Sequence, residues 1–106
     1  MKDRFRDWKF PKFNRDGTTR WHWKCQHHKN LKLGRRVDIG SFAYLNAEHG
    51  IEISDYVQIG SHCSLYSVST IDNKKGRIII KANARIGAHS VVMPGVPIGE
   101  NAVIVL

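Results

Sequence analysis

The chain has 106 residues and a formal net charge of +8 at neutral pH, which fits one small basic domain with no apolar run long enough to span a bilayer. Its two cysteines, Cys25 and Cys63, are too few for the disulfide framework of a small secreted protein. The charged N-terminus lacks the apolar segment of a secretory signal, so the sequence predicts a cytoplasmic protein.

Residues 1–30 interleave aromatic side chains with Lys, Arg and His. The segment Trp21-His-Trp-Lys-Cys alternates as a strand does, with one aromatic side and one polar side. A nucleic-acid surface uses the same residue types. The open end of a stacked β-structure, however, also needs a cover over its unpaired ladder. We therefore predict a basic, aromatic cap over residues 1–30 and no nucleic-acid partner.

Residues 31–106 carry an aliphatic residue at a short, nearly fixed period, often followed by glycine. The aliphatic positions are Leu33, Ile39, Leu45, Ile53, Ile59, Leu65, Ile71, Ile80, Ile86, Val92, Ile98 and Ile104. A hexapeptide period is typical of a parallel β-helix, in which identical positions stack about 4.8 Å apart. Taken three at a time, these positions predict four coils, with Ile71, Ile80 and Ile86 in the third. The predicted fold class is all-β.

Two stretches interrupt the period. Extra residues fall at 48–50 and at 72–76. Insertions in a solenoid leave through its corners and frequently line the binding face. We expect the chemistry of the protein at these two loops.

The run Ile86-Gly-Ala-His-Ser-Val-Val-Met-Pro-Gly-Val-Pro-Ile-Gly-Glu-Asn-Ala-Val-Ile104, together with the phased repeat, resembles the hexapeptide-repeat acyltransferases, and among them the sugar O- and N-acetyltransferases. The resemblance implies a left-handed parallel β-helix over residues 31–106 and assembly as a homotrimer. It also implies transfer of an acetyl or acyl group from coenzyme A to a hydroxyl or amine of a sugar or nucleotide-linked sugar, in surface-polysaccharide synthesis. The family pattern continues past Leu106 with a further coil, so we expect part of the coenzyme site to be missing from these residues, either because they are a fragment or because the natural chain is truncated.

The same resemblance implies site residues. The catalytic histidine of the galactoside and maltose branch aligns with Thr70, and an asparagine that reaches the acceptor aligns with Asn46, so both are predicted to bind substrate. Because Thr70 cannot act as the base, we predict His49, whose spacing to Ile53 resembles the base of the bacterial sugar N-acetyltransferases. His89 and Asp72 are the alternates. The predicted coils place His49, Thr70 and His89 on one edge and His62 on another.

The coenzyme is expected to contact Arg85 and Ala88, which match positions along the family's coenzyme groove. No metal is expected, because His22, His27 and His28 near Cys25 match no closed zinc pattern. The metal-binding gamma-class carbonic anhydrases share the fold, but the spacing of His49, His62 and His89 lacks their closely spaced pair. A second hypothesis remains open, that of a non-catalytic trimeric scaffold or truncated remnant of such an enzyme.

Overall fold

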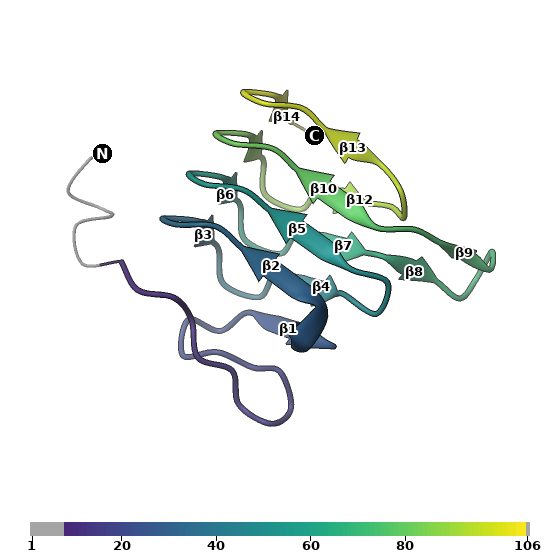
Figure 1. Ribbon diagram of the computed structural model, residues 1–106, viewed down its shortest axis with the longest axis horizontal. Helices are drawn as coiled ribbons and strands as arrows, with labels where there is room; N and C mark the ends of the chain where they lie inside the picture. Colours follow the sequence, from purple (N-terminus) through teal and green to yellow (C-terminus); the bar gives the residue numbers. More distant parts are fainter. Residues whose placement is uncertain (1–7, 106) are drawn as a thin grey trace.

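The computed structural model describes residues 8–105, in which short β-strands joined by turns begin at Lys24 and end at Ile104 (Figure 1). Within these residues the only helical element is the 3₁₀ turn η2 (His28–Asn30), which confirms the all-β prediction. No helix in the described part of the chain is long and apolar enough to cross a membrane.

Three parallel four-stranded sheets, here called A, B and C, form the body of residues 8–105. Sheet A contains β1 (Lys24–Gln26), β4 (Tyr44–Asn46), β7 (Ser64–Tyr66) and β12 (Val91–Val92). Sheet B contains β2 (Leu31–Leu33), β5 (Ile51–Ile53), β10 (Ile78–Ile80) and β13 (Pro97–Ile98). Sheet C contains β3 (Asp38–Ile39), β6 (Gln58–Ile59), β11 (Arg85–Ile86) and β14 (Val103–Ile104).

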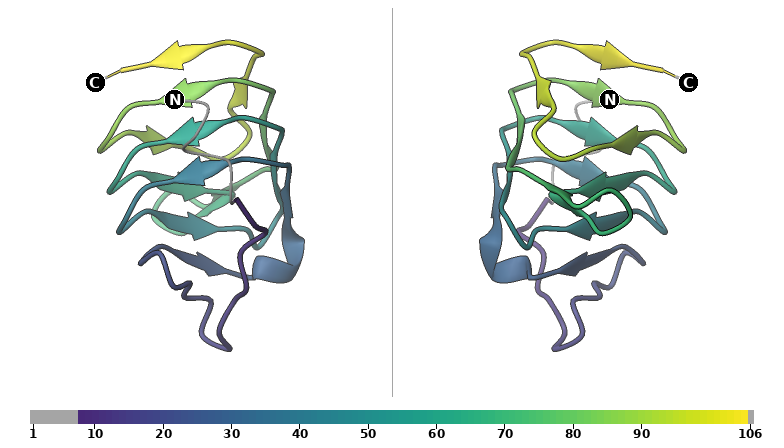
Figure 2. Two further views of the ribbon diagram at one scale, coloured as in Figure 1. Left: turned by 90° about the vertical axis from the view of Figure 1, so that its left-hand side faces the viewer. Right: turned by 90° about the vertical axis from the view of Figure 1, so that its right-hand side faces the viewer.

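From β2 onward the chain passes through the sheets in the constant order B, C, A, and we call each such passage a coil (Figure 2). The register places equivalent aliphatic residues directly over one another, for example Leu45 over Leu65 and Ile53 over Ile80. These side chains point inward and are buried, so the core is a narrow column shared by successive coils. The alternation of buried and outward residues along each strand follows from the period of two in β-structure.

The turns between the sheets are tight, and two local features accompany them. Corner residues such as Tyr56, His62 and Asn83 adopt positive φ angles of 63°, 59° and 61°. Gly60 lies so close to the next coil that a Cβ atom there would fall 2.6 Å from the backbone nitrogen of Ala88. Glycine directly after the aliphatic residue therefore allows neighbouring coils to approach.

The third coil differs from the prediction. Ile71 is 99% exposed and lies in the loop of an antiparallel hairpin formed by β8 (Val68–Ser69) and β9 (Lys74–Lys75). Ile80 instead stacks on Ile53 with 0% exposure, so the third coil begins with β10. The predicted third and fourth coils were therefore wrong by one position. Ile71 lies six residues after Leu65, as the repeat requires, but its neighbours in the sequence are polar. Ile80 enters the core because it pairs in register with the aliphatic residues Ile53 and Ile98.

The N-terminal segment closes the first coil. Trp23 is 4% exposed, and the ring of Phe13 meets its ring edge-on with centroids 5.6 Å apart. The indole N–H of Trp8 donates a hydrogen bond of 2.8 Å to the backbone carbonyl of Val37, beside the outermost strand of sheet C. The parallel stacking starts earlier than predicted, because Cys25 of β1 already pairs in register with Leu45.

Candidate functional site

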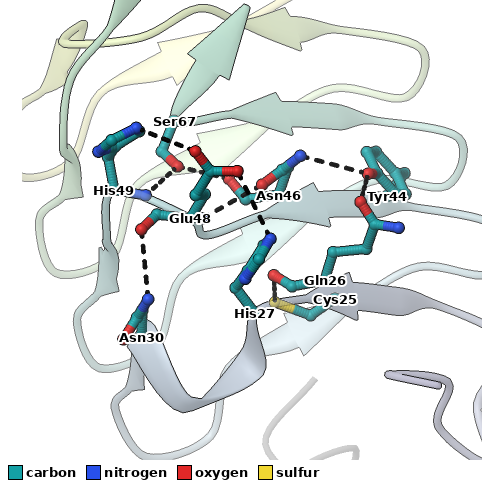
Figure 3. A network of polar contacts seen from close by, with 9 residues as sticks. All are labelled: Cys25, Gln26, His27, Asn30, Tyr44, Asn46, Glu48, His49 and Ser67. Carbon is teal, nitrogen blue, oxygen red and sulfur yellow. Dashed lines mark hydrogen bonds and ion pairs between the residues drawn. The ribbon is translucent and has the colours of Figure 1, made fainter.

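An acid–base pair occupies the turn between β4 and β5, which we call the first A-to-B corner (Figure 3). The imidazole Nε2 of His49 lies 3.2 Å from Oε2 of Glu48. The other carboxylate oxygen of Glu48, Oε1, lies 3.6 Å from Nε2 of His27. The side chains of His49 and Glu48 are 35% and 46% exposed, so the pair is accessible from solvent.

Hydrogen bonds to neighbouring coils hold the backbone of this corner. The buried hydroxyl of Ser67 accepts a bond of 2.9 Å from the His49 N–H and donates one of 2.7 Å to the Asn46 carbonyl. The side-chain oxygen of Asn46 accepts the Glu48 N–H at 3.1 Å, which forms an Asx turn. The side chain of Asn30 donates to the Glu48 carbonyl at 3.2 Å. The backbone carrying the His49–Glu48 pair is therefore positioned from several sides.

Beside this corner, the outward face of sheet A carries amide and phenol groups. The hydroxyl of Tyr44 donates to Oε1 of Gln26, and Nδ2 of Asn46 donates to the Tyr44 hydroxyl at 3.5 Å. The rings of Tyr44 and Tyr66 lie side by side with centroids 5.8 Å apart. Burial raises the pKa of the Tyr44 hydroxyl, which therefore stays protonated at neutral pH. Amide and hydroxyl groups next to ring faces match the hydroxyl groups and apolar faces of a sugar.

A shallow cavity of about 460 Å³ adjoins the pair on the side of sheet B. Its lining includes Lys29, Lys32 and Arg77 together with His49 and Glu48. Arg77 also forms an ion pair of 3.5 Å with Glu52 of β5. The cations place positive charge beside the pair on the side of this cavity, which favours an anionic ligand.

The predicted residues do not all meet. Thr70 and Asp72 lie in the hairpin loop that leaves between β7 and β10, at the next A-to-B corner after that of His49. A hydrogen bond from Ser69 holds the pKa of Asp72 below its usual value, and its carboxylate lies 3.7 Å from the Lys74 ammonium. Asp72 is therefore an ionised carboxylate on an exposed loop.

His89 lies on a different edge, in the turn between β11 and β12 that we call a C-to-A corner. Its ring stacks on that of His62 with centroids 4.8 Å apart, and the His62 ring lies 5.2 Å from that of Phe42. The prediction that His49, Thr70 and His89 share one edge is wrong with respect to His89. The cause is the misplaced third coil, which moved every later residue by one corner.

The predicted coenzyme residues lie with His89 rather than with His49. Arg85 is an exposed residue of β11 in sheet C, and Ala88 precedes His89 at the C-to-A corner. A shallow cavity of about 320 Å³ runs along sheet C between Asp38 and Val105 and includes Arg85 in its lining. One chain therefore carries its predicted base and its predicted coenzyme contacts on different edges.

Sequence reasoning missed several residues of the A-to-B corner. Glu48 directly precedes His49, and Tyr44 precedes Asn46 by two positions on the same face of a strand, so both could have been found. His27 could not, because it belongs to the segment predicted as a cap. Ser67 occupies an inward position where only its hydrogen bonds reveal a role.

We compared the chain with protein-family models, curated proteins and solved structures and found no significant match. Between residues 8 and 105, no group of three or more His, Cys, Asp or Glu side chains is arranged to hold a metal ion.

Proposed function

We propose that this protein is an acetyl-CoA-dependent acyltransferase that acts on a hydroxyl or amine of a sugar or nucleotide-linked sugar. The observation that carries the proposal is the His49–Glu48 pair beside the polar face formed by Tyr44 and Asn46. The phased repeat and its resemblance to the hexapeptide acyltransferases support it. The proposal includes left-handed winding of the coils, a cytoplasmic location and a place in surface-polysaccharide synthesis.

In this reaction His49 is the general base. Glu48 holds the Nε2 side of the imidazole, so Nδ1 is the nitrogen that accepts the proton of the acceptor hydroxyl or amine. The acceptor atom attacks the thioester carbonyl, a C–O or C–N bond forms, and the C–S bond breaks. The departing thiolate of coenzyme A takes up the proton. The Glu48 carboxylate stabilises the imidazolium between these steps, as the carboxylate of a catalytic triad does.

The separation of the site residues supports assembly as a homotrimer. His49 and Asn46 lie at the A-to-B corner, whereas Arg85 and Ala88 lie on sheet C and at the C-to-A corner. Copies packed side by side can place the base of one chain against the coenzyme contacts of its neighbour. Light scattering at micromolar protein should give the mass of a trimer. A monomeric mass would contradict a site shared between subunits.

The scaffold hypothesis stays as the second candidate, because Thr70 replaces the family's catalytic histidine and lies exposed in the hairpin loop. Calorimetric titration with acetyl-CoA separates the two. We expect saturable binding of acetyl-CoA by the wild-type protein. A folded assembly that shows no detectable binding would favour the scaffold. The matched ligand control is acetate, which lacks the nucleotide and the pantetheine arm and should give no heat above dilution.

A further inference from the structure

A second cavity, of about 400 Å³, lies between the N-terminal segment and the first coil. Its lining includes all three tryptophans of the protein, Trp8, Trp21 and Trp23. Val37 and Ile39, also in the lining, are buried core residues that provide an apolar floor together with Trp23. The volume lies in the range of small-ligand sites, which are mostly apolar with a few polar groups.

The aromatic walls are held by specific contacts. The Trp8 indole N–H is bonded to the Val37 carbonyl at 2.8 Å, and the Trp8 ring meets that of Phe10 edge-on with centroids 4.8 Å apart. The guanidinium of Arg20 lies over the Trp21 ring, 5.0 Å from its centroid. These contacts hold the Trp8 and Trp21 rings in place at the lining of the cavity.

The charged groups in the lining are Lys9, Arg20 and Asp38, of which the two cations are exposed. Indole faces bind planar bases by stacking, and Arg and Lys at the rim bind phosphate. We propose that this cavity binds the nucleotide part of a phosphorylated ligand, with the base among the tryptophans and the phosphate at Arg20 and Lys9. The carboxylate of Asp38 is suited to accept a hydrogen bond from a ribose hydroxyl.

Two ligands of the proposed reaction contain such a group, coenzyme A and a nucleotide-linked sugar. Asp38 lines both this cavity and the one along sheet C that includes Arg85. A ligand with its nucleotide among the tryptophans can therefore extend along sheet C toward the predicted coenzyme contacts. This link to acyl transfer rests on the proposed function, whereas the nucleotide site itself does not.

Intrinsic fluorescence is a direct test, because every tryptophan of the chain lines the cavity. The full chain is titrated separately with adenosine 3′,5′-bisphosphate, uridine diphosphate, adenosine and inorganic phosphate. We expect a saturable change in fluorescence with the nucleotides. Adenosine should bind at least about tenfold more weakly, because it has no phosphate to form charge-assisted hydrogen bonds. Tighter binding of the adenosine bisphosphate assigns the site to coenzyme A, and tighter binding of uridine diphosphate assigns it to a nucleotide-linked sugar.

Arg20→Gln should weaken nucleotide binding by about tenfold, because it removes a charged donor to phosphate. Lys75→Gln removes a charge of β9 that is also exposed and should leave the affinity unchanged. Unaltered melting temperatures exclude unfolding of either variant.

No saturable change with any nucleotide, or equal affinity in Arg20→Gln and the wild type, would overturn the proposal. Tighter binding of a short single-stranded oligonucleotide would also overturn it, in favour of a nucleic-acid surface. Acetyl-CoA turnover without nucleotide-dependent fluorescence would refute this site alone and leave the proposed function standing.

Discussion

Substitutions at two isoleucines, Ile80 and Ile71, distinguish which of them begins the third coil. Ile80 is 0% exposed and stacks between Ile53 and Ile98 in sheet B. Truncating a buried isoleucine to alanine typically costs about 2–5 kcal/mol, because it removes apolar contacts and leaves a cavity. Ile71 is 99% exposed, and a surface truncation of this kind changes stability by roughly 0.5 kcal/mol or less.

The assay is thermal unfolding of Ile80→Ala and Ile71→Ala, followed by circular dichroism. A loss of about 3 kcal/mol corresponds to a Tm lower by roughly 12 °C for a domain of about 100 residues. Ile71→Ala should stay within about 2 °C of the wild type by the same conversion. All proteins are measured at one concentration, because subunit association makes Tm concentration-dependent. Equal losses for the two variants would refute the assignment of Ile80, and not Ile71, to the core.

Three further predictions concern the coils, a buried thiol and the acid–base pair. Gly60→Ala should lower the unfolding free energy by about 1–3 kcal/mol in urea titrations, because its Cβ meets the Ala88 backbone, whereas Gly99→Ala, with open space around it, should be nearly neutral. Burial raises the pKa of the Cys25 thiol from 9.0 to about 12, so the thiol of the unfolded chain ionises at a lower pH than that of the folded chain. The free energy of unfolding should therefore be unaffected by this group below pH 9.0 and fall as the pH rises toward 12. The fall should be less steep in Cys25→Ala than in the wild type. Glu48→Gln should reduce kcat by about fivefold with little change in KM, since a half-exposed ion pair contributes about 1 kcal/mol or less.

Much of the fold follows from the repeat. The aliphatic positions from Leu33 to Leu65 all fall within strands of the structure, because a short period forces equivalent residues into one column. The error at Ile71 has a physical origin, since a period specifies spacing but not which residues leave the solenoid in a long insertion. The hairpin of β8 and β9 is stabilised by its own antiparallel pairing, which a count of hexapeptides does not contain.

The site was predictable only where its residues are close in sequence. Asn46 ends the strand before the corner and His49 lies in the corner itself, so their proximity follows from their spacing. The bond between Ser67 and the His49 backbone and the approach of His27 to Glu48 join different coils, so they depend on the register between strands. The position of His89 also depends on the register between strands. Because the third coil begins at Ile80, His89 lies on a different edge from His49.

The most direct test of the proposed function is the turnover of His49→Ala. Release of the coenzyme A thiol from acetyl-CoA is measured with a panel of sugars and nucleotide-linked sugars, for the wild type, His49→Ala and His89→Ala. Removal of a general base lowers turnover by about 10²–10⁴-fold, so His49→Ala should lose at least the lower value in kcat while keeping its Tm and its assembly. His89→Ala, which alters a ring stacked on His62 at another edge, should retain most of the wild-type kcat. Near-normal turnover of His49→Ala with loss of activity in His89→Ala would contradict the assignment of the base.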